Sequence, residues 1–185
     1  MKIEIIDTFI KDLKIIIPEI FEDHRGYFYE CYNKSLLDQN GLNYDFIQDN
    51  QSKSQYGTIR GLHFQTCPYA QAKLVRVMEG EIIDVAIDLR ASSQTFGKAF
   101  TLKLSADNRK QLLIPKGFAH GFGVLSNFAI VQYKIDNVYN PQSERGIIYN
   151  DPHFNLDWEI PDKDIILSEK DQKNEFFERN RSYFE

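Results

Sequence analysis

The chain is dominated by short runs in which apolar and polar residues alternate, the period of a β-strand that buries one face. Clusters of glycine, proline and small polar residues separate these runs. Runs of this kind lie at 3–6, 13–17, 27–32, 58–65, 73–79, 81–90, 99–105, 111–115 and from 128 onward. The pattern predicts an all-β antiparallel fold, a jelly roll or barrel.

Two segments carry helical signals. Residues 34–41 contain an internal Leu-Leu and end in Asn-Gly, which predicts a short connecting helix. Residues 167–180 are rich in charge and contain paired phenylalanines, and we expect them to form a closing helix near the surface. The architecture is therefore strands with a few short helices.

Residues 73–90 have the pattern of a β-hairpin with Glu79 and Gly80 at its turn. In the second arm the apolar residues at 83, 85, 87 and 89 share one face. Asp84 and Asp88 share the other face, which predicts that this side of the strand meets water.

Candidate chemistry concentrates at residues 57–77. Strict alternation would put Ile59, Gly61, His63 and Gln65 on one face of a strand. Arg60, with Leu62 and Phe64, would then lie on the opposite face. Taken alone, His63 would be read as a hydrogen-bonded histidine of the core, and the other polar residues described below favour a site instead.

Lys73 lies on the same strand face as Val75 and Val77, and this face is otherwise apolar. A buried ammonium group is costly, so either a carboxylate or a substrate oxygen should meet it. The alternative is a lysine at a strand end that reaches out to solvent.

Four further stretches carry polar groups that could belong to a site. Gln48, Asn50 and Ser52 fall on one face with Phe46 and could contact a ligand, or could form a polar loop. Glycines flank His120, which indicates close approach of the backbone to another strand or to a ligand. The alternative is a barrel corner in which the histidine is hydrogen-bonded to backbone.

Tyr133 lies on an apolar face with Ala129 and Val131, where its hydroxyl needs a partner. Earlier in the chain, Asp23 to Gly26 form a polar turn that is followed by aromatic residues. Arg25 in this turn could bind a phosphate, or could be an ordinary solvated arginine.

Composition limits the classes of function. The 185 residues suit one domain spanning 1–185. A net charge of −5 argues against binding a nucleic-acid polymer, so anion binding would be local. Two cysteines are too few for a disulfide framework. Charges interrupt the N-terminal segment, so neither a signal peptide nor a membrane span is expected, which predicts a cytoplasmic protein.

The four histidines are His24, His63, His120 and His153, and no two are closely spaced. The metal site common in cupin proteins contains a His-x-His pair, so we expect no metal here.

A set of motifs covers nearly the whole chain. They are EDHRGYFYE, FIQDNQSKS, GTIRGLHFQ, QAKLVRVMEGEIIDVAIDLR, TFGK, IPKGFAHGFGVLS, YKIDNVYNP, YNDP and LSEKD. In order and spacing they resemble the dTDP-4-dehydrorhamnose 3,5-epimerase family, which are metal-free cupins with a jelly-roll (double-stranded β-helix) fold. The resemblance implies a cytoplasmic isomerase of dTDP-rhamnose biosynthesis for cell-surface polysaccharides, with no cofactor.

The resemblance also implies roles for individual residues. His63 would be the catalytic base and Asp171 its orienting carboxylate, Tyr133 the opposing acid, and Lys73 the cation near the sugar carbonyl. Arg60 and His120 would lie in the sugar pocket. The implied nucleotide-binding residues are Gln48, Asn50, Tyr139 and Glu144, together with Arg25, Phe28 and Glu30 from the partner subunit of a homodimer with exchanged N-terminal strands.

These residue types suit epimerisation next to a ketone. The C–H bonds at C3 and C5 of a 4-keto sugar are acidic because each deprotonation gives an enolate. Inversion needs a base on one face, an acid on the other and a positive charge at the oxygen. A histidine, with an ordinary pKa of about 6.5, suits the base. No net electrons move, so no redox cofactor is required.

Three alternatives share most of these features. The first is an epimerase that inverts only C3 or only C5. The second is the same chemistry on another nucleotide sugar, such as a GDP-linked 4-keto heptose. The third is a sugar-nucleotide binding module without activity, which the joint presence of base, carboxylate, cation and acid disfavours.

Overall fold

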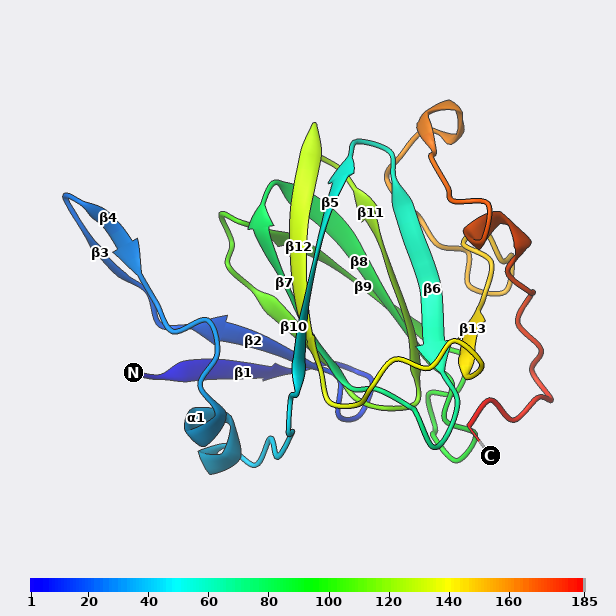
Figure 1. The fold of residues 1–185 in the computed structure, drawn as a ribbon, viewed down its shortest axis with the longest axis horizontal. Helices are drawn as coiled ribbons and strands as arrows, with labels where there is room; N and C mark the ends of the chain where they lie inside the picture. Colours follow the sequence, from blue (N-terminus) through cyan, green and yellow to red (C-terminus); the bar gives the residue numbers. More distant parts are fainter. Residues whose placement is uncertain (185) are drawn as a thin grey trace.

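In the computed structural model, which describes residues 1–184, two antiparallel sheets face each other (Figure 1). The first has the order β1-β2-β10-β7-β12-β5. Its strands are β1 (Ile3–Asp7), β2 (Lys14–Pro18), β10 (Gln111–Ile114), β7 (Lys73–Glu79), β12 (Phe128–Ile135) and β5 (Gln48–Gln55). The predicted all-β jelly roll is confirmed.

The second sheet has the order β13-β6-β11-β8-β9. Its strands are β13 (Glu144–Gly146), β6 (Ile59–Gln65), β11 (Phe118–Val124), β8 (Glu81–Asp88) and β9 (Ala99–Ser105). The polar stretch after Phe46 is therefore a strand, β5, rather than a loop.

The remaining elements are short. Helix α1 (Lys34–Gln39) is the predicted connector, and Asn33 caps it by accepting a hydrogen bond from the Leu36 amide at 3.1 Å. Strands β3 (Phe21–Asp23) and β4 (Gly26–Phe28) form a hairpin that projects from the body (Figure 1). The strand predicted at 27–32 thus stops at Phe28. Two 3₁₀ turns, η1 (Asp162–Asp164) and η2 (Asp171–Lys173), follow. No helix within residues 1–184 has the length and apolarity to cross a membrane.

Three apolar clusters hold these layers together. The largest lies between the sheets and includes Val75, Val131 and Phe122. A second packs the outer face of the five-stranded sheet against the C-terminal segment, around Trp158. A third, around Leu113, covers the outer face of the six-stranded sheet near α1.

The predicted hairpin at 73–90 is wrong. Its two arms are β7 and β8, which belong to different sheets and do not pair with each other. Gly80 has φ +81, and a Cβ at this position would overlap the Phe128 carbonyl oxygen and lie 2.5 Å from Ser126 Oγ. The chain can therefore turn a sharp corner at Gly80 and cross from one sheet to the other.

The faces predicted for β8 are correct, but the predicted contact with water is wrong. Val85 and Ile87 pack on the outer cluster, while Ala86 packs between the sheets. Asp84 and Asp88 share the inner side with Ala86 and are both fully buried. Both faces of this sheet are covered, so its acidic residues must find partners inside the protein.

The closing helix predicted at 167–180 is also wrong. Only the turn η2 is helical, and the rest consists of turns and irregular backbone. The flanking backbone bonds to the five-stranded sheet instead: the Ile59 amide donates to the Ile166 carbonyl, and the Ile148 amide to the Glu175 carbonyl. These bonds lay the segment along β6 and β13 (Figure 1).

Candidate active site

Two adjoining cavities open between the sheets and share His63, Lys73 and Tyr133 in their walls. One, of about 330 Å³, is also lined by Gln48, Asn50, Gln71, Tyr139 and Glu144. The other, of about 530 Å³, is also lined by Ser52, Arg60, His120, Lys170 and Asp171. The three shared residues thus lie where the two lobes of a single site meet.

The orientation of β6 differs from the prediction in one respect that matters for the site. Arg60 and His63 both line the larger cavity, although strict alternation would place them on opposite faces. The cause is a β-bulge: Arg60 pairs with Phe122 and His63 with His120, so Gly61 and Leu62 lie opposite Gly121 alone. The extra residue turns Leu62 outward and brings both polar side chains into the cavity.

Glycine permits the two strands to approach at this bulge. A Cβ on Gly121 would lie 2.7 Å from the Arg60 carbonyl oxygen and 3.1 Å from the Gly61 Cα. The close approach inferred from the glycines around His120 is therefore to a strand.

His63 is hydrogen-bonded to a carboxylate. Its Nε2 atom lies 2.5 Å from Asp171 Oδ1, and the two side chains are 29% and 6% exposed. Burial is the largest single influence on Asp171 and opposes its ionisation, but the hydrogen bond and charge of His63, together with the hydrogen bond from Ser168, outweigh burial and lower the pKa of Asp171. An ionised carboxylate only accepts hydrogen bonds, so Nε2 carries the hydrogen and Nδ1 keeps a lone pair. This arrangement suits a proton acceptor.

Lys73 projects from β7 onto the inner face, as predicted. Burial lowers the pKa of Lys73 to about 8, although Asp84 and Glu144 attract its positive charge. Within residues 1–184 no carboxylate oxygen lies within salt-bridge distance of Lys73 Nζ. The ammonium group is therefore available to an anionic oxygen in the cavity.

Tyr133 faces His63 from the other sheet. It lies on β12, pairs with Asn50 on β5 and Val75 on β7, and packs against the inner cluster, as the pattern predicted. Burial raises the pKa of Tyr133, so its hydroxyl stays protonated near neutral pH. A ligand between the sheets would have the imidazole on one side and a phenolic proton on the other.

His120 lies beside His63 on the neighbouring strand, and the two residues are directly paired. Its Nε2 atom is 2.9 and 3.1 Å from the two carboxylate oxygens of Asp84 on β8. The site thus contains a second imidazole with its own aspartate, which the sequence pattern did not reveal because Asp84 was expected to face water.

The smaller lobe has hydrogen-bonding groups of mixed type. Gln48 and Asn50 bond to each other at 2.9 Å on β5. Glu144 accepts hydrogen bonds from the Tyr139 hydroxyl at 2.6 Å and from Lys170 Nζ at 2.5 Å. Burial is the largest single influence on Glu144 and opposes its ionisation, but the hydrogen bonds from Lys170 and Tyr139 and the charge of Lys170 together lower the pKa of Glu144.

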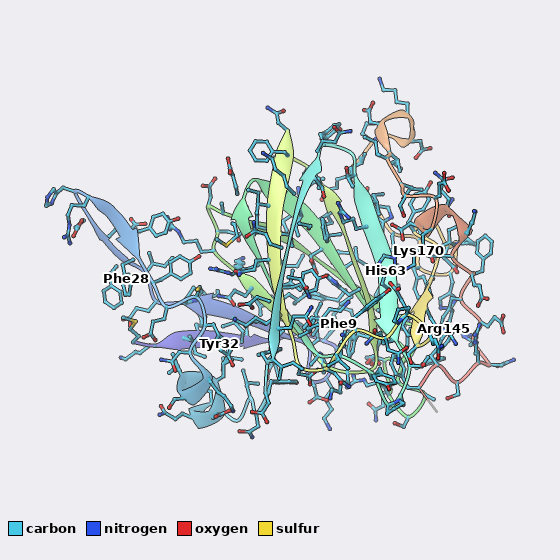
Figure 2. The ribbon with its side chains drawn as sticks, viewed as in Figure 1. Phe9, Phe28, Tyr32, His63, Arg145 and Lys170 are labelled. Carbon is cyan, nitrogen blue, oxygen red and sulfur yellow. The ribbon has the colours of Figure 1, made fainter. Side chains whose placement is uncertain are left out.

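Lys170 was missed in the sequence, although it directly precedes Asp171. Figure 2 shows Lys170 near His63, where the C-terminal segment passes β6. Gln65 was missed as an anchor: its amide nitrogen donates to the Val138 carbonyl and its amide oxygen accepts from the Asn140 amide, which fixes the loop that carries Tyr139.

The structure of one chain does not bring Arg25, Phe28 and Glu30 to the cavities. Arg25 pairs with Asp23 at 2.6 Å on the projecting hairpin, and Glu30 accepts a hydrogen bond from Asn33. Phe28 is 59% exposed and lies on this hairpin, far from His63 (Figure 2). Across residues 1–184, no group of three or more His, Cys, Asp or Glu side chains is arranged to hold a metal ion.

Comparison with known proteins gives consistent matches. The family model for dTDP-4-dehydrorhamnose 3,5-epimerase matches residues 7–179. The chain is 48% identical over 174 residues to the dTDP-4-dehydrorhamnose 3,5-epimerase of Shigella flexneri, covering 94% of this chain and 95% of that one.

Two solved structures are closely similar. The dTDP-4-dehydrorhamnose 3,5-epimerase of Elizabethkingia anophelis superposes with a TM-score of 0.91 at 52% identity, over 96% of this chain and 97% of the other. The dTDP-6-deoxy-D-glucose-3,5-epimerase of Legionella pneumophila, in complex with dTDP-4-keto-L-rhamnose, has a TM-score of 0.90 at 45% identity, over 94% and 92% of the two chains.

Proposed function

Because the chain belongs to the dTDP-4-dehydrorhamnose 3,5-epimerase family, we propose how its two-lobed cavity performs the reaction of that family. The protein is an isomerase that inverts C3 and C5 of dTDP-4-dehydro-6-deoxy-D-glucose to give dTDP-4-dehydro-L-rhamnose. The observation that carries the proposal is the placement of a carboxylate-bound imidazole and a protonated phenol on opposite sheets, with a cation between the two lobes.

His63 removes the proton from the carbon next to the ketone through Nδ1, while Asp171 holds the opposite ring nitrogen. The electron pair moves onto the C4 oxygen, and the ammonium group of Lys73 stabilises the resulting enolate. Tyr133 then delivers a proton to the other face of the carbon. His63 then releases to solvent the proton that it took from carbon, and Tyr133 regains a proton from solvent, after which the second carbon reacts in the same way.

The smaller lobe is proposed to hold the nucleotide. Gln48, Asn50 and Tyr139 offer hydrogen bonds to a base or sugar. Lys170 lines the larger lobe, but its ion pair with Glu144 brings it to the border of the smaller lobe, where it would be a cation for the diphosphate. Lys170 is paired with Glu144 in the present structure, so a diphosphate would compete with that carboxylate for it. The larger lobe, with Arg60 and His120, would then hold the 4-keto sugar.

The test of this function is solvent isotope incorporation. The protein incubated with dTDP-4-dehydro-6-deoxy-D-glucose in D₂O should give a product that carries deuterium at both C3 and C5. NMR of the recovered sugar distinguishes the alternatives: one labelled carbon indicates an enzyme that inverts a single centre. A protein that only binds the sugar would incorporate no label.

We expect Lys73→Met to reduce kcat by about two orders of magnitude with a smaller change in KM, because the charge on the oxygen grows towards the transition state. In the unmodified protein the cation is present below a pH of about 8 and is lost above it. The kcat/KM profile should therefore fall as pH rises through this value. A change confined to KM would instead make Lys73 a ligand of the ground state.

We propose that the projecting hairpin completes the neighbouring site in a homodimer, in line with the implied exchange of N-terminal strands. Phe21, Tyr27 and Phe28 are all exposed on this hairpin, and Arg25 at its tip is available to a phosphate. The proposal also includes a cytoplasmic location and a place in rhamnose supply for cell-surface polysaccharides.

Mixed dimers test the shared site. A subunit carrying Arg25→Ala, paired with a subunit carrying His63→Ala, has one site in which both defects coincide and one site free of both, if the hairpin serves its neighbour. Each mixed dimer should therefore have up to half of the activity of a wild-type dimer, whereas a dimer of either variant alone remains impaired. A monomer that is fully active at assay dilution would refute the sharing.

A further inference from the structure

Asp84 is a fully buried carboxylate that takes no part in the proton transfers described above. It projects from β8 into the space between the sheets, and its two oxygens lie 3.1 and 2.9 Å from Nε2 of His120. The His120 side chain is itself 7% exposed. This carboxylate is hydrogen-bonded to one imidazole. Burying a carboxylate costs free energy, which indicates that Asp84 has a specific task.

The hydrogen bond decides which ring nitrogen of His120 carries the hydrogen. A carboxylate accepts but does not donate, so Nε2 is the protonated nitrogen. Burial lowers the pKa of His120 despite the attraction of Asp84, so the ring is neutral near pH 7 and Nδ1 holds a lone pair. Among residues 1–184, Nδ1 has no hydrogen-bond partner and is not one of the buried unsatisfied atoms, so it remains open to the cavity.

We propose that Asp84 is a positioning residue for His120 in the larger lobe. By holding Nε2, it makes Nδ1 of His120 the acceptor of a hydrogen bond from a hydroxyl group of the bound sugar. The inference rests on the proposed function for its substrate, a 4-keto sugar with hydroxyls beside the reacting carbons. Lys73, Arg60 and the Tyr133 hydroxyl are all donors in this lobe. His63 takes the proton from carbon, so of the two imidazoles in this lobe His120 is the one free to accept from a sugar hydroxyl.

Asp84 has a second effect through its charge. Lys73 on β7 faces the same space, and the carboxylate of Asp84 attracts its ammonium group and opposes the effect of burial on the Lys73 pKa. The other charged or titratable groups around the cavity are His63 and Arg60 on β6, Tyr133 on β12, Tyr139 in the loop after β12, Glu144 on β13, and Lys170 and Asp171 on the C-terminal segment. Removing Asp84 would leave Lys73 with fewer negative neighbours, so its cationic form would be lost at lower pH.

Long-range ¹H–¹⁵N NMR of the protein without substrate tests the tautomer, because it separates protonated from unprotonated ring nitrogens. The chain has four histidines, and His120→Gln identifies the signals of His120 by their loss. We expect a neutral ring near pH 7 with hydrogen on Nε2. Hydrogen on Nδ1, or an imidazolium ring, would overturn the proposal, and this measurement needs no Asp84 variant to fold.

Asp84→Asn tests the role of the carboxylate. An amide can present either its oxygen or its nitrogen to Nε2, so the NMR signals should report both tautomers. We expect KM for the dTDP-linked 4-keto sugar to rise about tenfold, while inhibition by dTDP alone is unchanged. The alkaline limb of kcat/KM should move to lower pH. A variant with the wild-type tautomer and pH profile would contradict the proposal.

Asp88→Asn is the matched control. Asp88 is also fully buried on β8, but it bonds to Arg90, Ser93 and Thr95 instead of a histidine. We expect Asp88→Asn to lower thermal stability without changing the His120 tautomer or the pH profile. Failure of the epimerase function itself would appear separately, as a wild-type protein that incorporates no deuterium while its His120 tautomer is as expected.

Discussion

His63→Ala should abolish inversion at both carbons and also abolish exchange of the substrate protons with D₂O. The variant lacks the imidazole whose Nε2 atom lies 2.5 Å from Asp171 Oδ1, which is the proposed base. A positioned base contributes about 10²–10⁴-fold, and both epimerisations need it. We therefore expect a loss of at least about three orders of magnitude in kcat/KM.

Folding and nucleotide binding should survive this change. The His63 side chain is 29% exposed and lines the cavity instead of an apolar cluster, so little packing is lost. Titration with dTDP and a thermal unfolding curve are the measurements. Near-wild-type turnover in His63→Ala would remove this residue from the proposed mechanism.

Asp171→Asn is the graded comparison for the same pair. The amide can still bond to Nε2, but it no longer stabilises the imidazolium formed when His63 takes a proton. Its activity should therefore fall between that of the wild type and His63→Ala. An equal loss in the two variants would assign Asp171 a direct share in the proton transfer.

Tyr133→Phe should separate proton exchange from inversion. His63 and Lys73 remain able to form the enolate, but the phenolic proton on the opposite sheet is gone. His63 can return the proton, or a deuteron from solvent, to the face from which it came. We expect substrate recovered from D₂O to carry deuterium with its original configuration, while product formation falls about 10²–10³-fold.

NMR of the separated substrate and product pools measures both quantities in one experiment. The aromatic ring of phenylalanine keeps the packing of Tyr133 against Val75 and Val131, so a folding defect is not expected. Full inversion at both carbons by Tyr133→Phe would show that water or another side chain supplies the proton.

Local alternation determined much of this protein from sequence alone. It placed Lys73 and Tyr133 on inward faces and gave the all-β class, because in a strand successive side chains point to opposite sides. The short helix before residue 41 was likewise readable from its Leu-Leu pair and its Asn-Gly ending. The roles of His63, Asp171, Tyr139 and Glu144 came from the family resemblance instead.

The tertiary structure decided what depends on partners distant in the chain. Pairing separated β7 from β8, and a bulge against Gly121 turned Arg60 to the side of His63. Backbone bonds on both sides of the turn η2 hold the C-terminal segment against β6 and β13, which brings the carboxylate of Asp171 to a histidine 108 residues away. Covering both faces of β8 buried Asp84 beside His120. The pattern within one strand reports its two faces, but which neighbour covers each face is a property of the whole fold.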